Sequence, residues 1–222
     1  MADTAIIYNP PVNRGLDILF QDDTLLVLNK PCGLLSVPGK GVDRQDSLAT
    51  RVQAEYPEAK VVHRLDMSTS GIMLMACGKL SQSQLSKQFQ QRQVQKIYIV
   101  VVDGKLELDN GEIDLPLITD WPNRPKQKVD LMHGKSSQTR YQVLQYNGAD
   151  NTTRVRLEPV TGRSHQLRVH MQQLGHAIVG DRLYASKEIQ NKADRLLLHA
   201  QSISFTHPVT MQAVSFDSPA PF

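Results

Sequence analysis

The sequence predicts an α+β protein in which helices and loops flank a mixed, largely antiparallel central β-sheet. Short runs of β-branched or aliphatic residues alternate with Gly, Pro, Asn and Asp over nearly the whole chain, as strands alternate with turns. Predicted strands outnumber helices and no regular strand–helix–strand alternation occurs, which argues against a doubly wound parallel fold. A length of 222 residues fits one domain, or one domain with a small appendage.

The apolar runs predict strands at six places: 25–29, 72–77, 97–102, 141–146, 154–160 and 196–205. A first helix is predicted over 47–56, because Leu48 and Val52 share one face and Pro57 stops it. These elements already contain more strand than helix, as the fold class requires.

Two further helices are predicted from end signals. One covers 81–92 and opens with Ser81 in a capping box. The other covers 165–174, with Ser164 as its N-cap and Gly175 just past its end.

The N-terminal 15 residues have neither the charge nor the apolar core of a signal peptide, and we expect a partly mobile tail that residues 16–20 tie down. No apolar run approaches the ~20 residues of a membrane span. Cys32 and Cys77 have neither metal-site spacing nor the number for a disulfide framework. The sequence therefore indicates a cytoplasmic protein with reduced thiols and no membrane or metal site.

Positive charge is concentrated in residues 121–170. This span holds nine Lys or Arg against three acids, a balance of +6, while the whole chain carries +3. Such asymmetry is typical of a polyanion-binding face on a nearly neutral body. From charge alone, a solvated basic face without a partner is an equally good interpretation.

The run Val-Val-His-Arg-Leu-Asp-Met-Ser-Thr-Ser-Gly, residues 61–71, places polar and charged groups between two apolar stretches. A loop between strands is where reactive groups are commonly presented. The carboxylate of Asp66 can act there as a nucleophile or as an acid or base. The alternative is an aspartate that caps a turn and pairs with Arg64.

The string HRLDxxTSG resembles the active-site signature of the RluA family of RNA pseudouridine synthases, with every specified position present. Further family segments follow in order: Asn29-Lys30-Pro31-Cys32-Gly33-Leu34, Lys96-Ile97-Tyr98, Gly162-Arg163-Ser164-His165-Gln166-Leu167-Arg168-Val169-His170 and Leu198-His199-Ala200. The resemblance covers residues 17 to 217 and implies a single catalytic domain over 16–222. Since motif material starts near residue 25, no separate N-terminal RNA-binding domain is expected.

The resemblance assigns roles. Asp66 matches the catalytic aspartate, and Tyr98 matches the tyrosine that stacks on the target base. Arg168 matches the arginine that pairs with the aspartate, and Arg64 the residue that enters the RNA stack where the uridine leaves it. Since a guanidinium can bind a carboxylate bidentately, we expect Arg168 to form such a pair with Asp66 and to keep it ionised.

A second RNA contact is predicted in the stiff run 120–128, which resembles the D-W-P-N-R-P-K-Q segment of the family's dual-specificity member. Its RNA-facing residues would be Trp121, Arg124, Lys126 and Lys128, because cations bind phosphate and prolines stiffen a loop. The alternative is a surface loop anchored by Trp121. Arg163 and His165 are also expected to contact RNA; His63, His165 and His170 are interpreted as hydrogen-bonding groups rather than metal ligands.

The activity implied is isomerisation of uridine to pseudouridine in RNA stem-loops, without metal or cofactor. The resemblance further implies two targets, uridine 746 of large-subunit (23S) ribosomal RNA and uridine 32 of a tRNA anticodon loop, and a monomer. Two alternative functions are an aspartate-nucleophile hydrolase and a non-catalytic RNA-binding module of the same fold. The first would want Mg²⁺ carboxylates or a second catalytic carboxylate, which residues 61–71 do not supply.

Overall fold

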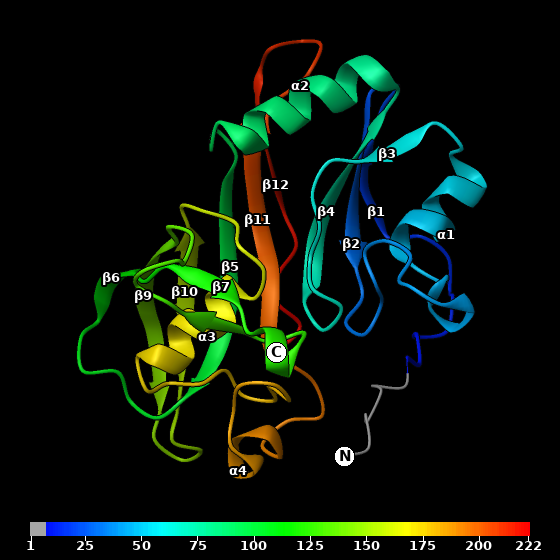
Figure 1. The fold of residues 1–222 in the computed structure, drawn as a ribbon. Helices are drawn as coiled ribbons and strands as arrows, with labels where there is room; N and C mark the ends of the chain where they lie inside the picture. Colours follow the sequence, from blue (N-terminus) through cyan, green and yellow to red (C-terminus); the bar gives the residue numbers. More distant parts are fainter. Residues whose placement is uncertain (1–7) are drawn as a thin grey trace.

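A mixed β-sheet dominates the computed structural model, which describes residues 8–222 (Figure 1). In this part of the chain the ten-stranded sheet has the order β1-β2-β4-β11-β5-β10-β9-β6, with β3 on β4 and β12 on β11. Its strands are β1 Ile18–Gln21, β2 Leu25–Lys30, β3 Ala59–Val61, β4 Ser70–Cys77, β5 Gln95–Asp103, β6 Asn110–Asp114, β9 Gln138–Asn147, β10 Thr152–Pro159, β11 Leu198–Thr206 and β12 Ala213–Asp217. All pairs are antiparallel except β4 with β11, which confirms the predicted fold class.

Helices and a small hairpin complete the fold. The helices are α1 Leu48–Glu55, α2 Lys79–Gln90, α3 Gln166–Gln173 and α4 Lys187–Gln190, with 3₁₀ turns at Val42–Arg44 and Trp121–Asn123. The hairpin pairs β7 Leu117–Thr119 with β8 Gln127–Val129. In Figure 1, α1 lies beside the β1–β4 half of the sheet, and α3 lies over the β5–β9 half. No helix in residues 8–222 is long and apolar enough to cross a membrane.

Two core clusters lie on the same side of the sheet, one in each half. The first packs β2 and β4 against α1 through residues such as Leu28 and Val52. The second packs β5 and β10 against α3 through residues such as Val100 and Met171. Tyr98 packs against both clusters. The β5 position of Tyr98 is therefore the seam where the two halves of the sheet meet.

Gly71 permits the parallel contact between β4 and β11. It pairs with Ala200 and has a φ of +110°, which L side chains rarely adopt. A Cβ at this position would lie 2.3 Å from the carbonyl oxygen of Ala200, which is too close for any side chain. Glycine is thus required for the loop before β4 to reach β11.

Two of the three predicted helix starts were wrong. The helix expected to begin at Ser81 begins at Lys79, because Gly78 has a φ of +82° and turns the chain directly out of β4. The N-cap expected at Ser164 is His165, in the left-handed region at φ 53°. The first helix is confirmed: Ser47 forms a capping box with Thr50.

The N-terminal segment is bonded to the body from Tyr8 onward, and residues 1–7 of the predicted tail lie outside the described part of the chain. The hydroxyl of Tyr8 donates to the carbonyl of Asp46 at 2.9 Å and accepts from the Leu35 amide at 3.0 Å. Arg51 donates to the carbonyl of Pro11 at 2.7 Å. The chain then joins the sheet through β1.

Candidate active site

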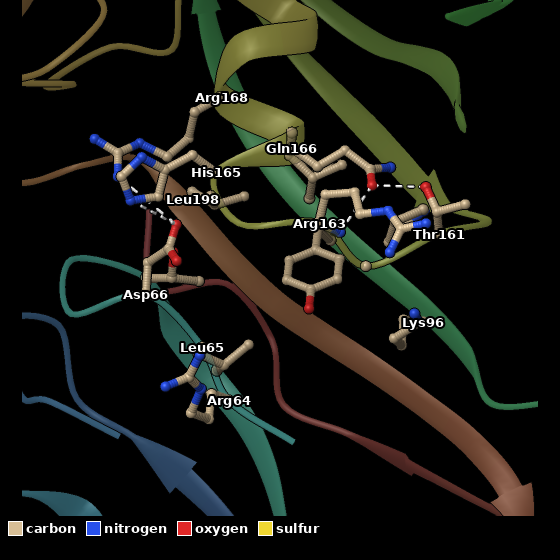
Figure 2. Close-up of a pocket in the computed structure, with 15 residues that line it drawn as sticks. Arg64, Leu65, Asp66, Lys96, Thr161, Arg163, His165, Gln166, Arg168 and Leu198 are labelled. Carbon is tan, nitrogen blue, oxygen red and sulfur yellow. Dashed lines mark hydrogen bonds and ion pairs between the residues drawn. The ribbon is translucent and has the colours of Figure 1, made fainter. Parts of the chain in front are cut away.

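One pocket collects groups from three separate parts of the chain (Figure 2). The loop before β4 supplies Arg64 and Asp66, and β5 supplies Tyr98. The segment that leads into α3 supplies His165 and Arg168, together with Arg163. The three residues predicted to carry the chemistry are thereby brought together, although up to 102 positions separate them in sequence.

Strand β11 brings the Asp66 loop to Tyr98. The loop runs into Ser70, which pairs with His199 of β11, and Ala200 of β11 pairs with Tyr98 on its other side. The Ser70 hydroxyl and the Nδ1 atom of His199 are hydrogen-bonded at 2.8 Å. The Leu-His-Ala segment near the end of the sequence therefore acts as a spacer between two pocket walls.

Lys30 fixes the Asp66 loop through hydrogen bonds to backbone carbonyl groups. Its side chain is fully buried, and its ammonium donates to the carbonyl oxygens of Leu34, Pro31 and Met67 at 2.7, 3.0 and 3.1 Å. Burial lowers the pKa of Lys30 to about 7, although Asp66 acts in the opposite direction. The Ser36 hydroxyl also donates to the carbonyl of Leu65 at 2.6 Å. The loop is thus fixed on both sides of Asp66.

Arg168 holds Asp181 rather than Asp66 bidentately, which corrects the predicted geometry, although the predicted ion pair with Asp66 is present. Its Nε and Nη2 atoms donate to the two carboxylate oxygens of Asp181 at 2.8 and 2.6 Å. Its Nη1 atom lies 3.7 Å from Oδ2 of Asp66, at ion-pair range. The two guanidinium nitrogens bind Asp181 because this carboxylate is fully buried and requires a cation, whereas Asp66 is 27% exposed. Burial opposes the charge, but the bonds to Asp181 raise the pKa of Arg168.

His165 is the second group beside the carboxylate. Its Nε2 atom lies 3.8 Å from Oδ2 of Asp66, the same oxygen that Arg168 approaches (Figure 2). Burial lowers the pKa of His165, Asp66 works against this shift, and Arg168 works with it. The ring is therefore neutral near pH 7. Its left-handed backbone is a strained conformation of the kind found at functional sites.

Tyr98 and Lys96 form the β5 wall. Burial, assisted by the charge of Asp66, raises the pKa of Tyr98 well above its ordinary value, so its hydroxyl stays protonated. Burial also lowers the pKa of Lys96, two positions earlier on the same face of the strand. Lys96 lines the pocket and was not among the predicted site residues.

Fewer cations of residues 121–170 are available to form the predicted basic face than the charge count suggests. Arg168 is buried, Arg140 and Arg156 pair with Glu112 and Glu158, and Arg154 donates to the carbonyl of Phe222. These cations are close in sequence but lie on different faces of the molecule, because successive side chains of β9 and β10 point to opposite faces of the sheet. Arg64 and Arg163 line the pocket, and the hairpin carries Arg124, Lys126 and Lys128.

The 120–128 loop is the tip of the β7–β8 hairpin and lies outside the pocket lining. Trp121 is 67% exposed, so it does not anchor the loop to the body, and the guanidinium of Arg124 lies 4.5 Å from its ring centre. The anchor is instead Gln127, whose backbone amide donates to the hydroxyl of Tyr184 at 2.8 Å. Lys126 and Lys128 line a neighbouring groove beside α3.

His63 and His170 are hydrogen-bonded structural groups, as predicted. The amide of Leu74 donates to Nε2 of His63 at 2.9 Å, and the ring stacks on Phe89. Nδ1 of His170 bonds the hydroxyl of Thr139 at 2.9 Å. Within residues 8–222 no group of three or more His, Cys, Asp or Glu side chains is arranged to hold a metal.

We expect His63 to make the protein less stable as the pH falls. Burial lowers the pKa of His63 to about 3 in the folded state, against 6.5 ordinarily. Between these values only the unfolded chain binds the proton, so unfolding is favoured by up to about 1.4 kcal/mol per pH unit. Urea titrations from pH 7 to 4 should show a shallower pH slope for His63→Gln. The variant His133→Gln, at a 72% exposed side chain, should keep the wild-type slope. Equal slopes in the two variants would contradict this assignment.

Comparison with known proteins defines the class to which this fold and pocket belong. Residues 24–173 match the RNA pseudouridylate synthase family, and the chain belongs to that family. It is therefore an isomerase that acts on RNA, which decides against the hydrolase and the non-catalytic module.

Particular relatives support the narrower resemblance. The chain is 54% identical to "Dual-specificity RNA pseudouridine synthase RluA" of Escherichia coli (strain K12), over 97% of this chain and 98% of the relative. It is 56% identical to the protein of the same name from Vibrio parahaemolyticus, over 90% and 82%. "Human RNA Pseudouridylate Synthase Domain Containing 1" superposes with a TM-score of 0.80 at 28% identity, over 96% of this chain and 87% of that one. The resemblance to the RluA family is confirmed.

Three structural contributors were missed by the sequence analysis: Lys30, Asp181 and Tyr184. Lys30 belongs to a recognised family segment, but its chemistry depends on three carbonyls that only the folded loop assembles. Asp181 and Tyr184 follow a glycine in a stretch without periodicity. The available signal was an aspartate and a tyrosine three positions apart, which is too common to single out.

Proposed function

We propose that Asp66, Tyr98 and Arg168 carry the isomerisation, and that the substrates are a tRNA anticodon stem-loop and a large-subunit ribosomal RNA hairpin. The observation that carries the catalytic assignment is the shared pocket of these three side chains. The dual specificity is supported by relatives at 54% and 56% identity whose names state it.

The chemistry needs an ionised carboxylate at the ribose or the uracil ring. Asp66 is exposed enough to meet a nucleoside, and Arg168 stands at ion-pair range to stabilise its charge. In the reaction the bond between C1′ and N1 breaks, the uracil turns, and C1′ bonds C5. The proton on C5 is then lost to solvent and N1 takes up a proton, so that the product is an isomer of uridine.

The uridine must leave its helix or loop stack to enter the pocket. We propose that Tyr98 stacks on the extruded base, because its ring lies at the seam of the two core clusters and its hydroxyl stays neutral. Arg64 would fill the vacated place in the RNA. Its exposed side chain lies on the rim, on the opposite side of Asp66 from Arg168 (Figure 2). Arg163, His165 and the hairpin residues Trp121, Arg124, Lys126 and Lys128 would contact flanking nucleotides.

The deciding assay measures tritium release from uridine labelled at C5, in a tRNA anticodon stem-loop and separately in a ribosomal RNA hairpin. Wild-type protein should release tritium from both RNAs. The matched control is a stem-loop in which cytidine replaces the target uridine and the label is carried at other uridines. Release from one RNA alone would contradict dual specificity, and binding without any release would contradict the catalytic assignment.

RNA affinity should fall steeply with salt. Five cations lie at the pocket rim and on the hairpin. If each neutralises one phosphate of a single-stranded loop, the slope of log affinity against log salt is about −3.5. Filter binding between about 50 and 300 mM salt measures it. Lys128→Gln should reduce the slope by about 0.7, whereas Lys105→Gln, at the far end of β5, should not. A flat dependence would show that the RNA face lies elsewhere.

We also propose that residues 16–222 act as one catalytic domain, and that the protein works as a cytoplasmic monomer. The continuous ten-stranded sheet from β1 to β12 supports the single domain. Gel filtration with light scattering tests the oligomeric state.

A further inference from the structure

Tyr184 hydrogen-bonds to both the β7–β8 hairpin and the pocket. Its hydroxyl oxygen accepts from the Gln127 backbone amide at 2.8 Å and lies 2.7 Å from Nδ1 of His165. Its ring lies under the guanidinium of Arg168, 5.0 Å from centre to Cζ, and meets the His165 ring edge-on. The tyrosine thus contacts both groups that face Asp66.

The hydrogen bonds around Tyr184 favour one direction for each proton. A backbone amide can only donate, so the Tyr184 oxygen is the acceptor from Gln127. Burial raises the pKa of Tyr184 to about 12, so the phenol keeps its own proton and can donate a hydrogen bond to Nδ1 of His165. A neutral imidazole that accepts at Nδ1 carries its hydrogen on Nε2. That atom faces Oδ2 of Asp66 at 3.8 Å.

We propose that Tyr184 is a positioning residue that sets the Nε2–H tautomer of His165 and ties the hairpin to the catalytic carboxylate. Arg168 and the Nε2–H group then both face Oδ2, which leaves Oδ1 of Asp66 as the oxygen that meets the nucleoside. RNA that moves the hairpin tip moves Gln127, and through Tyr184 it moves His165. The inference rests on the proposed catalytic role of Asp66.

Two measurements on Tyr184→Phe test the two halves of the proposal. Imidazole ¹⁵N NMR of the free protein reports the tautomer without RNA. Wild type should show Nε2–H for His165, and Tyr184→Phe should show a mixture. In the tritium assay, the kcat of Tyr184→Phe should fall about tenfold, as expected when one partner of a partly buried hydrogen bond is removed. Tyr56→Phe, which loses one hydroxyl bond to Gln21, is the matched control and should keep wild-type kcat.

A double-mutant cycle separates positioning from a general structural effect. His165→Asn keeps a residue that tolerates the left-handed backbone. If Tyr184 acts through His165, the double variant should have the kcat of His165→Asn alone, and additive losses would overturn the proposal. An Nδ1–H tautomer in wild type, or an unchanged kcat in Tyr184→Phe, would overturn it as well. Absence of tritium release by wild type would instead refute the proposed substrates and, with them, the coupling, while the tautomer measurement on the free protein would stand.

Discussion

Asp66→Asn should abolish uridine isomerisation and leave RNA binding nearly unchanged. The amide is close in shape to the carboxylate but neither ionises nor acts as a base, so tritium release should fall by a factor on the order of 10⁴. Folding should persist because Arg168 keeps Asp181 as its buried partner. Tritium release and filter binding on the same RNA measure the two quantities.

A matched substitution controls for the loss of one negative charge. Asp109→Asn changes an exposed carboxylate beside β6, at the end of the sheet order, and should keep wild-type activity and affinity. Substantial release by Asp66→Asn would assign the chemistry to another group in the pocket. Loss of RNA binding together with activity would show that Asp66 holds the substrate rather than transforms it.

Asp181→Asn should cause the largest loss of stability among the substitutions proposed. It leaves the guanidinium of Arg168, only 4% exposed, without its buried counter-charge. Breaking such a pair from one side lowers the free energy of unfolding by about 3–5 kcal/mol. The asparagine oxygen can still accept from the amides of Leu183 and Tyr184, as Oδ1 of Asp181 does, so the measured loss reports the charge. Urea unfolding measures it.

The surface pair of Asp103 with Lys192 is the natural comparison. Its 2.7 Å separation is almost the 2.6 Å of Arg168 and Asp181, but its side chains are 25% and 27% exposed. Water screens such a pair, so Asp103→Asn should lower the free energy of unfolding by less than about 1 kcal/mol. Equal losses in the two variants would mean that Arg168 finds a new partner, for which Asp66 is the nearest carboxylate described.

The strands and the catalytic string could be predicted because their signals are local. A run such as 72–77 is apolar at every position, and β4 is buried almost throughout. The motif segments carried Asp66, Tyr98 and Arg168 directly, and the pocket collects all three.

The arrangement around those residues could not be predicted because it depends on competition between distant partners. Arg168 was assigned to Asp66 since no local pattern announces Asp181, yet a fully buried carboxylate demands the fork more strongly than one 27% exposed. The N-cap of α3 is His165 rather than the predicted Ser164, because the Gln166 side chain bonds Thr161 and the amide of Arg163. The preference of serine for the N-cap position is therefore outweighed by these hydrogen bonds of Gln166.

The chain has a single tryptophan, and it stands at the tip of the β7–β8 hairpin. Indole emission responds to its immediate surroundings, and here the ring is open to solvent on one side and touched by Arg124 on the other. Tryptophan fluorescence, excited apart from the six tyrosines, consequently observes one place in the molecule, with no background from a buried indole. Stopped-flow mixing with an unlabelled stem-loop could time the arrival of nucleic acid at that tip separately from the later bond rearrangement.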